Sequence, residues 1–247
     1  MFPITQRFIT GHCRPYRKLE RVTAVIIHWT ANTRRGAGAM ANRNYFSSSP
    51  KTPEGKPIYA SAHFCVDSIS IVQCLPEDEV GYHVGSSRPY KPDGIRIKGN
   101  SSSPNNVTIG IEMCVNEDGD FNITRSQTIE LTRYLVQKYN ISRINVLRHF
   151  DITGKDCPKM MLDNNVWNNF LDEVFMVNSS STHSQNPTAK QLRVNVSELN
   201  VRKGPGTNFN ILRKLKLGDR ISIYEYNGKW GRIGIDEWVH SDYLIED

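Results

Sequence analysis

Residues 22–28 have the sequence VTAVIIH, a β-branched and almost continuously apolar run that ends in a histidine. Such a run is typical of a strand that is covered on both faces of its sheet. Further strands are predicted at 62–66, 70–74 and 107–114. After His28 the chain turns out of the sheet, and ligand sites gather at strand ends in α/β folds. His28 is therefore a candidate site residue, although a structural histidine hydrogen-bonded at the sheet rim fits the same position.

Helical patterns alternate with these strands. Thr124–Gln127 has the form of a capping box, which predicts a helix from there to about Asn140. A short strand is expected at 144–147 and a last helix at 165–176. Because strands and helices interleave, residues 1–176 are predicted to form an α/β domain.

A linker and a second domain are predicted after this region. Residues 177–189, VNSSSTHSQNPTA, contain no Asp, Glu, Lys or Arg and consist mostly of small polar residues, which indicates a flexible linker. Residues 190–247 contain short β-rich runs separated by turn signals, among them Asn227-Gly228. Asn-Gly between two such runs is a strong hairpin signal. We therefore predict a small all-β barrel at 190–247.

The composition restricts the class of protein. Of the 247 residues, 38% are apolar and 23% are charged, so the chain is able to bury a core and is not disordered by composition. No apolar stretch approaches the ~18–20 residues of a membrane span, and residues 1–18 lack the apolar core of a signal peptide. We expect neither an integral membrane protein nor a classically secreted precursor, which places synthesis in the cytoplasm.

The charge balance is modestly basic. There are 31 Lys and Arg residues against 25 Asp and Glu residues, which gives a net charge of +6. The basic residues are scattered among acidic ones without a run of five, so nucleic-acid binding is not indicated. An anionic bacterial cell wall suits a basic excess as well as DNA does.

A metal site is suggested by three residues far apart in the sequence. His149 follows the strand expected at 144–147, so it occupies the same kind of position as His28. Seven residues separate it from Cys157, enough for a loop to return and bring both donors to one ion. The five cysteines are odd in number and lack a C-x-x-C pair, which favours reduced thiols. Two imidazoles and a thiolate favour zinc and leave a fourth position for water, whereas an ordinary buried thiol is the alternative for Cys157.

Hydrolysis at such a metal needs a proton acceptor and a cation. Glu112 is the lone acid in the apolar segment TIGIEMC, where burial would raise its pKa toward a useful value. Lys155, two residues before Cys157, would stabilise a developing oxyanion. The alternatives are a rim carboxylate and a solvated loop lysine. His63 and His83 are either substrate contacts or hydrogen-bonded core histidines.

Five motifs in order carry a family resemblance. They are VIIHWTAN at 25–32, SAHFCVD at 61–67, IVQCLPEDEVGYHVG at 71–85, NNVTIGIEMC at 105–114 and RHFDITGKDCP at 148–158. This set resembles the type 2 N-acetylmuramoyl-L-alanine amidases, zinc enzymes related to peptidoglycan recognition proteins. The resemblance implies a central mixed sheet flanked by helices. It also implies cleavage of the amide between N-acetylmuramic acid and L-alanine.

The resemblance assigns roles to the same candidate residues. It implies that zinc is bound by His28, His149 and Cys157. Glu112 matches the acidic catalytic position of the family, and Lys155 matches a lysine that stabilises the transition state. Some members have a catalytic tyrosine where this chain has Ala62. That role is therefore absent here or filled by Glu112.

The C-terminal region resembles a bacterial SH3 (SH3b) domain, on the segments LNVRKGP at 199–205 and WVH at 238–240. In cell-wall hydrolases such modules commonly anchor the enzyme, so bacterial peptidoglycan is the expected partner of both domains. An amidase with a wall-binding module resembles a phage endolysin for Gram-positive lysis, and a host autolysin is the alternative. The oligomeric state is left open.

Two functions of other classes remain as alternatives. A glycan-cleaving hydrolase would pair Glu112 with a second acid such as Asp120 or Asp151 and would need no metal. A non-catalytic peptidoglycan-binding protein would share the fold. Members of that kind typically lack the cysteine ligand, whereas Cys157 is present here.

Overall fold

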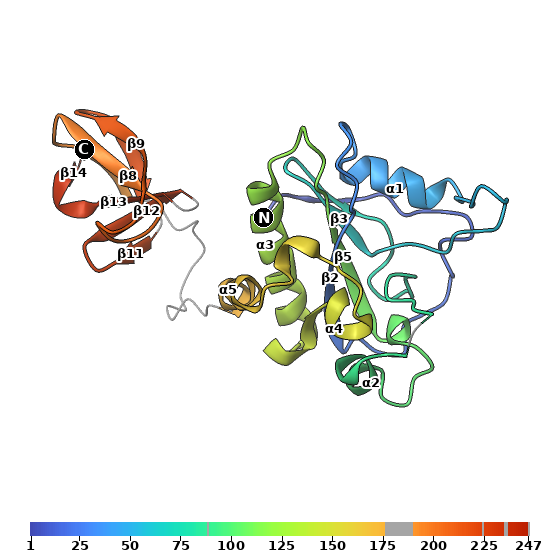
Figure 1. Cartoon of the computed structure of the whole chain (residues 1–247). Helices are drawn as coiled ribbons and strands as arrows, with labels where there is room; N and C mark the ends of the chain where they lie inside the picture. The colour runs from blue at the N-terminus through green and yellow to red at the C-terminus, as the bar shows by residue number, and fades with distance from the viewer. Residues whose placement is uncertain (88, 176–189, 224, 235–236, 247) are drawn as a thin grey trace. The chain divides into compact units, whose positions relative to one another are not determined.

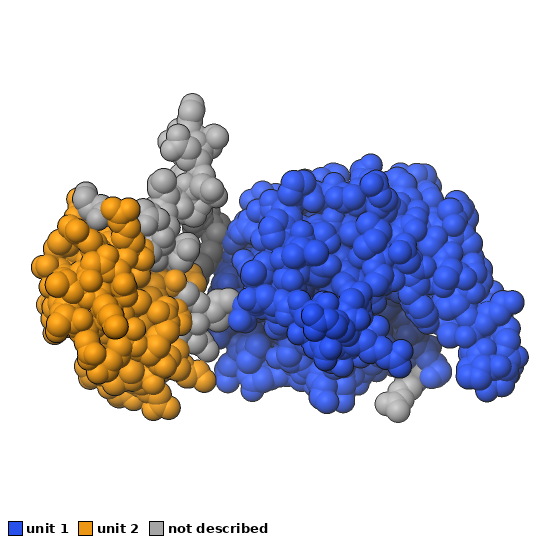
Figure 2. Space-filling view, turned by 90° about the horizontal axis from the view of Figure 1, so that it is seen from above, with its two compact units in different colours: residues 1–177 blue, residues 178–247 orange. Residues whose placement is uncertain are grey.

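The computed structural model describes residues 1–87, 89–175, 190–223, 225–234 and 237–246. It divides into two compact units, Met1–Val177 and Asn178–Asp247 (Figure 1), which Figure 2 shows in blue and orange. The first unit is α/β and the second is all-β, so the predicted fold class is confirmed. The linker predicted at 177–189 lies outside the described residues.

A six-stranded mixed sheet forms the centre of the first unit, in the order β1-β4-β3-β5-β2-β6. The strands are β1 (Ile4–Gln6), β2 (Ala24–Trp29), β3 (Phe64–Val66), β4 (Ile71–Gln73), β5 (Thr108–Met113) and β6 (Val146–Arg148). Only the β3–β4 pair is antiparallel among these neighbours. The parallel centre, β5 beside β2, is buried on both faces as the apolar run in β2 predicts.

Helices cover both faces of this sheet (Figure 1). The described residues contain α1 (Ala39–Ser47), α2 (Pro92–Lys98), α3 (Phe121–Tyr139), α4 (His149–Thr153) and α5 (Asn164–Phe175), with short 3-10 turns η1 (Pro104–Asn106), η2 (Arg143–Asn145) and η3 (Lys159–Met161). Val25 and Ile27 of β2 pack with α3 and α5, whereas Ala24 and Ile26 pack with α2 and α4. Because side chains alternate along a strand, His28 belongs to the α2 and α4 face.

Two boundaries differ from the prediction, and two helices were not predicted. Helix α3 begins at Phe121 and not at Thr124, because the Asp120 carboxylate caps it by accepting the N–H groups of Asn122 at 2.8 Å and Ile123 at 3.3 Å. The capping box at Thr124 was therefore the wrong signal. The strand expected at 144–147 is shifted to β6, since η2 occupies the residues before it. Helices α1 and α2 were not predicted.

The second unit consists of two antiparallel sheets, ordered β10-β7-β14 and β11-β12-β13-β8-β9. Its strands are β7 (Lys190–Val194), β8 (Glu198–Arg202), β9 (Ile211–Lys216), β10 (Arg220–Ile223), β11 (Glu225–Asn227), β12 (Trp230–Gly234), β13 (Glu237–His240) and β14 (Leu244–Glu246), with η4 (Ser241–Tyr243) between the last two. The predicted Asn-Gly hairpin joins β11 to β12, with Gly228 at φ 58°. Among the described residues, no helix is both long and apolar enough to span a membrane.

Candidate active site

The three predicted metal ligands meet at one end of the parallel strands. His28 lies near the end of β2, and His149 is the first residue of α4, directly after β6. Ile27 pairs with Arg148 across these strands, so the two histidines that follow are neighbours. Each of the three residues offers one ligand atom, and these atoms all lie within 4.8 Å of one another. The side chains are buried, at 1% exposure for His28, 3% for His149 and 2% for Cys157.

The return of the chain to Cys157 uses a short helix where a loop was expected. Helix α4 spans the first five residues after β6, and Gly154 ends it at φ 78°. The Asp151 carboxylate holds the helix start by accepting from the Arg148 backbone N–H at 2.9 Å and from its guanidinium at 2.8 Å. The carbonyl of Cys157 then accepts the N–H of Phe150 at 2.9 Å. This hydrogen bond holds Cys157 next to α4, the helix that begins with His149.

The His149 ring supplies the evidence that the cluster fits a cation. Both of its ring nitrogens are buried and have no hydrogen-bond partner in the structure. A buried polar group without a partner is rare and costs about 1–3 kcal/mol. Burial lowers the pKa of His149 to about 4, with Lys155 adding to the effect, so the neutral ring keeps a lone pair for a ligand. The Sγ atom of Cys157 lies 3.6 Å from His28 Nδ1. Two imidazoles and a sulfur suit a divalent transition metal.

Glu112 lies beside the three donors on the same face of the sheet. It pairs in register with His28 across β5 and β2. Its Oε2 atom is buried without a hydrogen-bond partner. Burial raises the pKa of Glu112 to about 7, against the opposing effect of Lys155. The carboxyl can therefore take up and release a proton near neutral pH.

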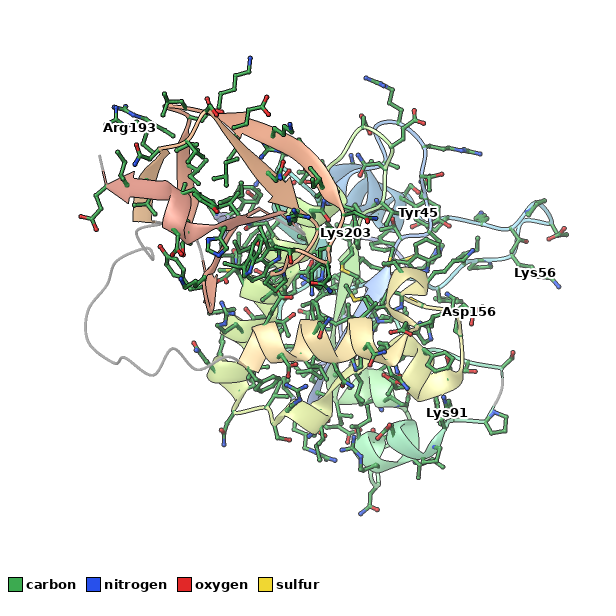
Figure 3. All side chains as sticks on the ribbon, turned by 60° about the vertical axis from the view of Figure 1, so that its left-hand side comes forward. Tyr45, Lys56, Lys91, Asp156, Arg193 and Lys203 are labelled. Atoms are coloured by element: carbon green, nitrogen blue, oxygen red, sulfur yellow. The ribbon has the colours of Figure 1, made fainter. Side chains whose placement is uncertain are left out.

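A pocket of about 340 Å³ joins these groups to the surface. Lys155 is exposed and lines this pocket together with Glu112 and the three donors. Figure 3 labels the next residue, Asp156, on the loop that follows α4. Phe46, Tyr59 and Tyr82 also line the pocket, and the sequence analysis did not single them out.

The two remaining histidines of the motifs have different surroundings. His63 Nε2 donates to the Glu79 carbonyl at 2.8 Å, and its Nδ1 accepts the Gly110 N–H at 3.0 Å. It does not line the pocket and is a hydrogen-bonded core histidine. His83 lines the pocket and lies with its Nδ1 atom 3.1 Å from His28 Nε2.

Comparison with protein families agrees with this arrangement. Residues 18–160 match the family described as N-acetylmuramoyl-L-alanine amidase, which is more than half of the 247 residues. The chain belongs to the N-acetylmuramoyl-L-alanine amidase family. Residues 197–245 match the bacterial SH3 domain. The resemblance drawn from the sequence motifs is therefore confirmed for both regions.

Individual amidases align with much of the chain. CwlH of Bacillus subtilis (strain 168) is 39% identical over 150 residues, covering 61% of this chain and 52% of the relative. CwlL of Bacillus licheniformis is 27% identical over 234 residues, covering 92% of this chain and 62% of the relative. Both are named N-acetylmuramoyl-L-alanine amidases. The solved catalytic domain of XlyA matches with a TM-score of 0.56 and 33% identity, over 70% of this chain and 99% of that one. The chain spans about half the length of the curated relatives it matches.

In this chain, the position at which some amidases have a tyrosine is buried and lies outside the pocket. Ala62 is fully buried and does not line the pocket. Tyr59 and Tyr82 do line it, with ring centroids 5.5 Å apart. Two tyrosines therefore line the pocket of this chain from other positions.

The glycan-cleaving alternative finds no second acid in the pocket. Glu112 is the one acidic residue among those that line it. Asp120 caps α3, and Asp151 pairs with Arg148 at 2.8 Å. Neither lines the pocket, so the arrangement of two facing carboxyls that such hydrolases use is not formed by the described residues.

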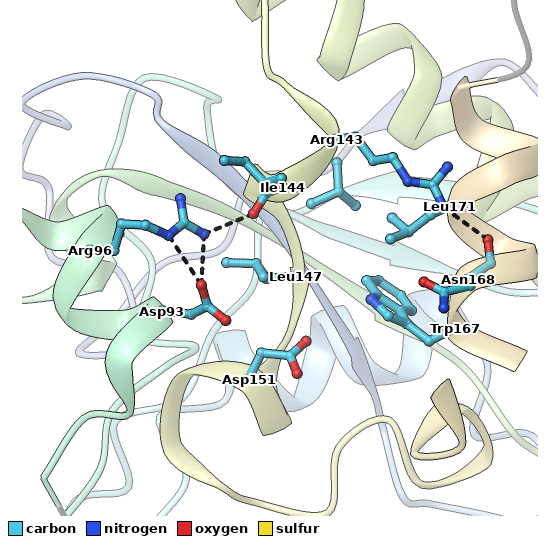
Figure 4. Close-up of a pocket in the computed structure, with 10 residues that line it drawn as sticks. Asp93, Arg96, Arg143, Ile144, Leu147, Asp151, Trp167, Asn168 and Leu171 are labelled. Atoms are coloured by element: carbon cyan, nitrogen blue, oxygen red, sulfur yellow. Dashed lines mark hydrogen bonds and ion pairs between the residues drawn. The ribbon is translucent and has the colours of Figure 1, made fainter. Parts of the chain in front are cut away.

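A larger hollow of about 500 Å³ lies beside the edge strand β6 (Figure 4). Its charged side chains are paired with oppositely charged residues or with the backbone. Arg96 donates to Asp93 at 2.8 Å and to the Ile144 carbonyl at 2.8 Å, and Arg143 pairs with Asp172 at 2.8 Å. Because these groups are already partnered, the smaller pocket is the better candidate for catalysis.

Proposed function

We propose that the chain is a zinc-dependent amidase that cleaves the bond between N-acetylmuramic acid and L-alanine in bacterial peptidoglycan. Residues 1–176 would carry the catalysis, with zinc held by His28, His149 and Cys157. The observation that carries the proposal is the unpartnered His149 ring within a buried His, His, Cys cluster. Glu112 and Lys155 line the same pocket.

Zinc fits this donor set because nitrogen and thiolate ligands favour it, and three protein ligands leave one position open. When bound, zinc acts as a Lewis acid that polarises a carbonyl and makes water acidic enough to attack at neutral pH. Burial raises the pKa of the Cys157 thiol to about 12, so loading the site displaces a proton from sulfur.

Glu112 and Lys155 have complementary roles in this proposal. The Glu112 carboxylate accepts the proton of the attacking water and passes it to the leaving L-alanine nitrogen. The Lys155 ammonium lies on the exposed side of the pocket and stabilises the negative charge that develops on the carbonyl oxygen. A single carboxyl is sufficient for both proton transfers, because Glu112 first accepts the proton and then delivers it.

Product analysis on purified Gram-positive cell walls tests the activity. The proposal expects new L-alanine amino groups, no increase in reducing sugar ends, loss of activity with a chelator and recovery on addition of zinc. New reducing ends that persist in chelator would identify a glycan hydrolase. Binding to walls without either product would identify a non-catalytic peptidoglycan-binding protein.

We further propose that residues 190–247 bind the cell wall and that the chain acts as an endolysin on Gram-positive walls. The match to the bacterial SH3 domain supports wall binding. A solved structure described as a mutant endolysin from Bacillus subtilis, 34% identical with a TM-score of 0.56, supports the endolysin role. Rapid lysis of Gram-positive cells by added protein is expected, and intact cells after addition of active protein would contradict the endolysin role.

A further inference from the structure

The metal site is one end of a row of four imidazoles. The rings of His149, His28, His83 and His63 follow one another with centroids 4.9, 5.2 and 5.7 Å apart, each nearly perpendicular to the next. All four are less than 8% exposed. His63 is held by hydrogen bonds to Glu79 and Gly110. His83 is therefore the ring that lies between His63 and His28, a predicted metal ligand.

The hydrogen on His83 is located by its neighbours. Thr108 donates its hydroxyl hydrogen to the Pro104 carbonyl at 2.8 Å, so its oxygen has only lone pairs left for other bonds. His83 Nε2 lies 3.2 Å from this oxygen and 3.3 Å from the Thr108 carbonyl. Both Thr108 oxygens act as hydrogen-bond acceptors here, so Nε2 of His83 carries the hydrogen.

The position of the hydrogen on His28 follows from that on His83. Burial favours the neutral form of His83, and a neutral imidazole has one hydrogen, so its Nδ1 atom is an acceptor. His28 Nε2, at 3.1 Å, must then be the donor. The lone pair of His28 is left on Nδ1, the atom that faces Cys157 Sγ at 3.6 Å.

We propose that His83 is a positioning residue that selects the tautomer of His28, so that Nδ1 and not Nε2 binds the metal. The inference rests on the proposed metal site. A ligating histidine usually donates its second N–H to a carboxylate, carbonyl or water, and loss of such a partner weakens metal binding about 10–100-fold. In this chain the partner is another imidazole, which orients the ring without adding a negative charge.

Metal affinity of the full chain tests the role of His83. A titration against a chromophoric zinc chelator should show affinity about 10–100-fold weaker for His83→Phe than for the parent chain. His83→Gln should recover part of the loss, because its carboxamide oxygen can accept the His28 N–H. The matched control is His63→Phe, in the same row and also buried. It should lower the melting temperature and leave zinc affinity within about threefold, since the hydrogen bonds of His63 go to Glu79 and Gly110 and not to a proposed ligand.

Long-range ¹H–¹⁵N correlation spectra of the zinc-loaded parent chain provide a test that needs no variant. His28 should show a hydrogen on Nε2 and the metal on Nδ1. The reverse tautomer, or equal zinc affinity of His83→Phe and the parent, would overturn the role of His83 while leaving the metal site intact. Absence of zinc binding by the parent chain would instead overturn the proposed function.

Discussion

The chemistry of Glu112 is set by its place beside His28 at the end of a buried strand. Because burial raises its pKa to about 7, the ionised form needed to accept a proton decreases below that pH. We expect Glu112→Gln to retain zinc and to lose about 10²–10⁴-fold in the rate of L-alanine amino-group release. In the parent chain, kcat/KM should fall as the pH is lowered through 7. Normal turnover by Glu112→Gln would remove this residue from the mechanism.

The same carboxyl makes a prediction about stability. A raised pKa means that the protonated form is favoured in the folded state, so this contribution is complete below about pH 4.3 and is lost as the pH rises through 7. In metal-free protein, Glu112→Gln should therefore increase the free energy of unfolding by roughly 1–3 kcal/mol at pH 8, with little change at pH 4. Urea denaturation in the presence of a chelator measures the free energy of unfolding at both pH values. An equal effect at the two pH values would argue against ionisation as the cause.

At the scale of elements, alternate residues of strand β5 face the hydrophobic core and the candidate site. Ile109 and Ile111 pack under α3 and α5, whereas Gly110 and Glu112 lie on the opposite face. A Cβ at Gly110 would lie 2.6 Å from His83 Nδ1, which is closer than a Cβ atom comes to a neighbouring heavy atom in a folded protein. Gly110→Ala should therefore displace His83 and weaken zinc binding, although it removes no polar group. Chelator competition measures this, and an unchanged affinity would show that the ring is free to move.

The N-cap of α3 gives Asp120 a structural role, distinct from the catalytic role proposed for Glu112. Asp120→Ala should lower the free energy of unfolding by about 1 kcal/mol, because two backbone N–H groups lose their acceptor. Thermal melting measures this change. The rate of wall hydrolysis should stay at the parent level, whereas a loss of activity in folded protein would restore Asp120 as a catalytic acid.

These elements also show what the sequence could predict. The apolar run of β2 has to be covered on both faces, so the strand and the site at its end were predictable. The capping box at Thr124 was misleading because Asp120 is an equally good cap four residues further from the helix centre. The pattern in α1 is weak, since only Ala39 and Phe46 of its nine residues are buried. The hydrogen-bonding role of His83 depends on contacts across 55 residues of sequence, which no local pattern contains.

At the scale of the whole molecule, buried histidines make the first unit sensitive to acid. Burial lowers the pKa of His63 to about 4 and that of His83 well below its usual value. Unfolded histidines take up protons near pH 6.5, so this stability is complete above about pH 6.5 and is lost as the pH falls toward 4. The free energy of unfolding should decrease by roughly 1–3 kcal/mol per pH unit in that window. Urea denaturation of metal-free protein measures it, and His63→Gln should have a shallower dependence.

The second unit has a candidate surface for wall binding. A hollow of about 380 Å³ is lined by Trp230, His240 and Tyr243 among others, and the Trp230 and His240 ring centroids are 5.1 Å apart. Aromatic side chains often dominate binding energy, so Trp230→Ala in the full chain should weaken co-sedimentation with purified walls about tenfold or more. Hydrolysis of soluble muropeptides should be unchanged.

Tyr226→Ala is the matched control for that experiment. Tyr226 is an exposed aromatic residue of the same unit and does not line the hollow. Its loss should leave co-sedimentation at the parent level. If both variants sediment like the parent chain, the wall is bound by another surface.

The wide spacing of the three donors also determines when the site can exist. His28 and Cys157 are 129 residues apart, with His149 only shortly before the latter. A chain still being synthesised therefore holds one ligand while 120 further residues are added, and then gains the other two almost together. Until Cys157 has left the ribosome, the nascent polypeptide has no complete site for an ion. The proposed metal site thus becomes complete in a single step, and fragments released by premature termination before that point lack at least one of its ligands.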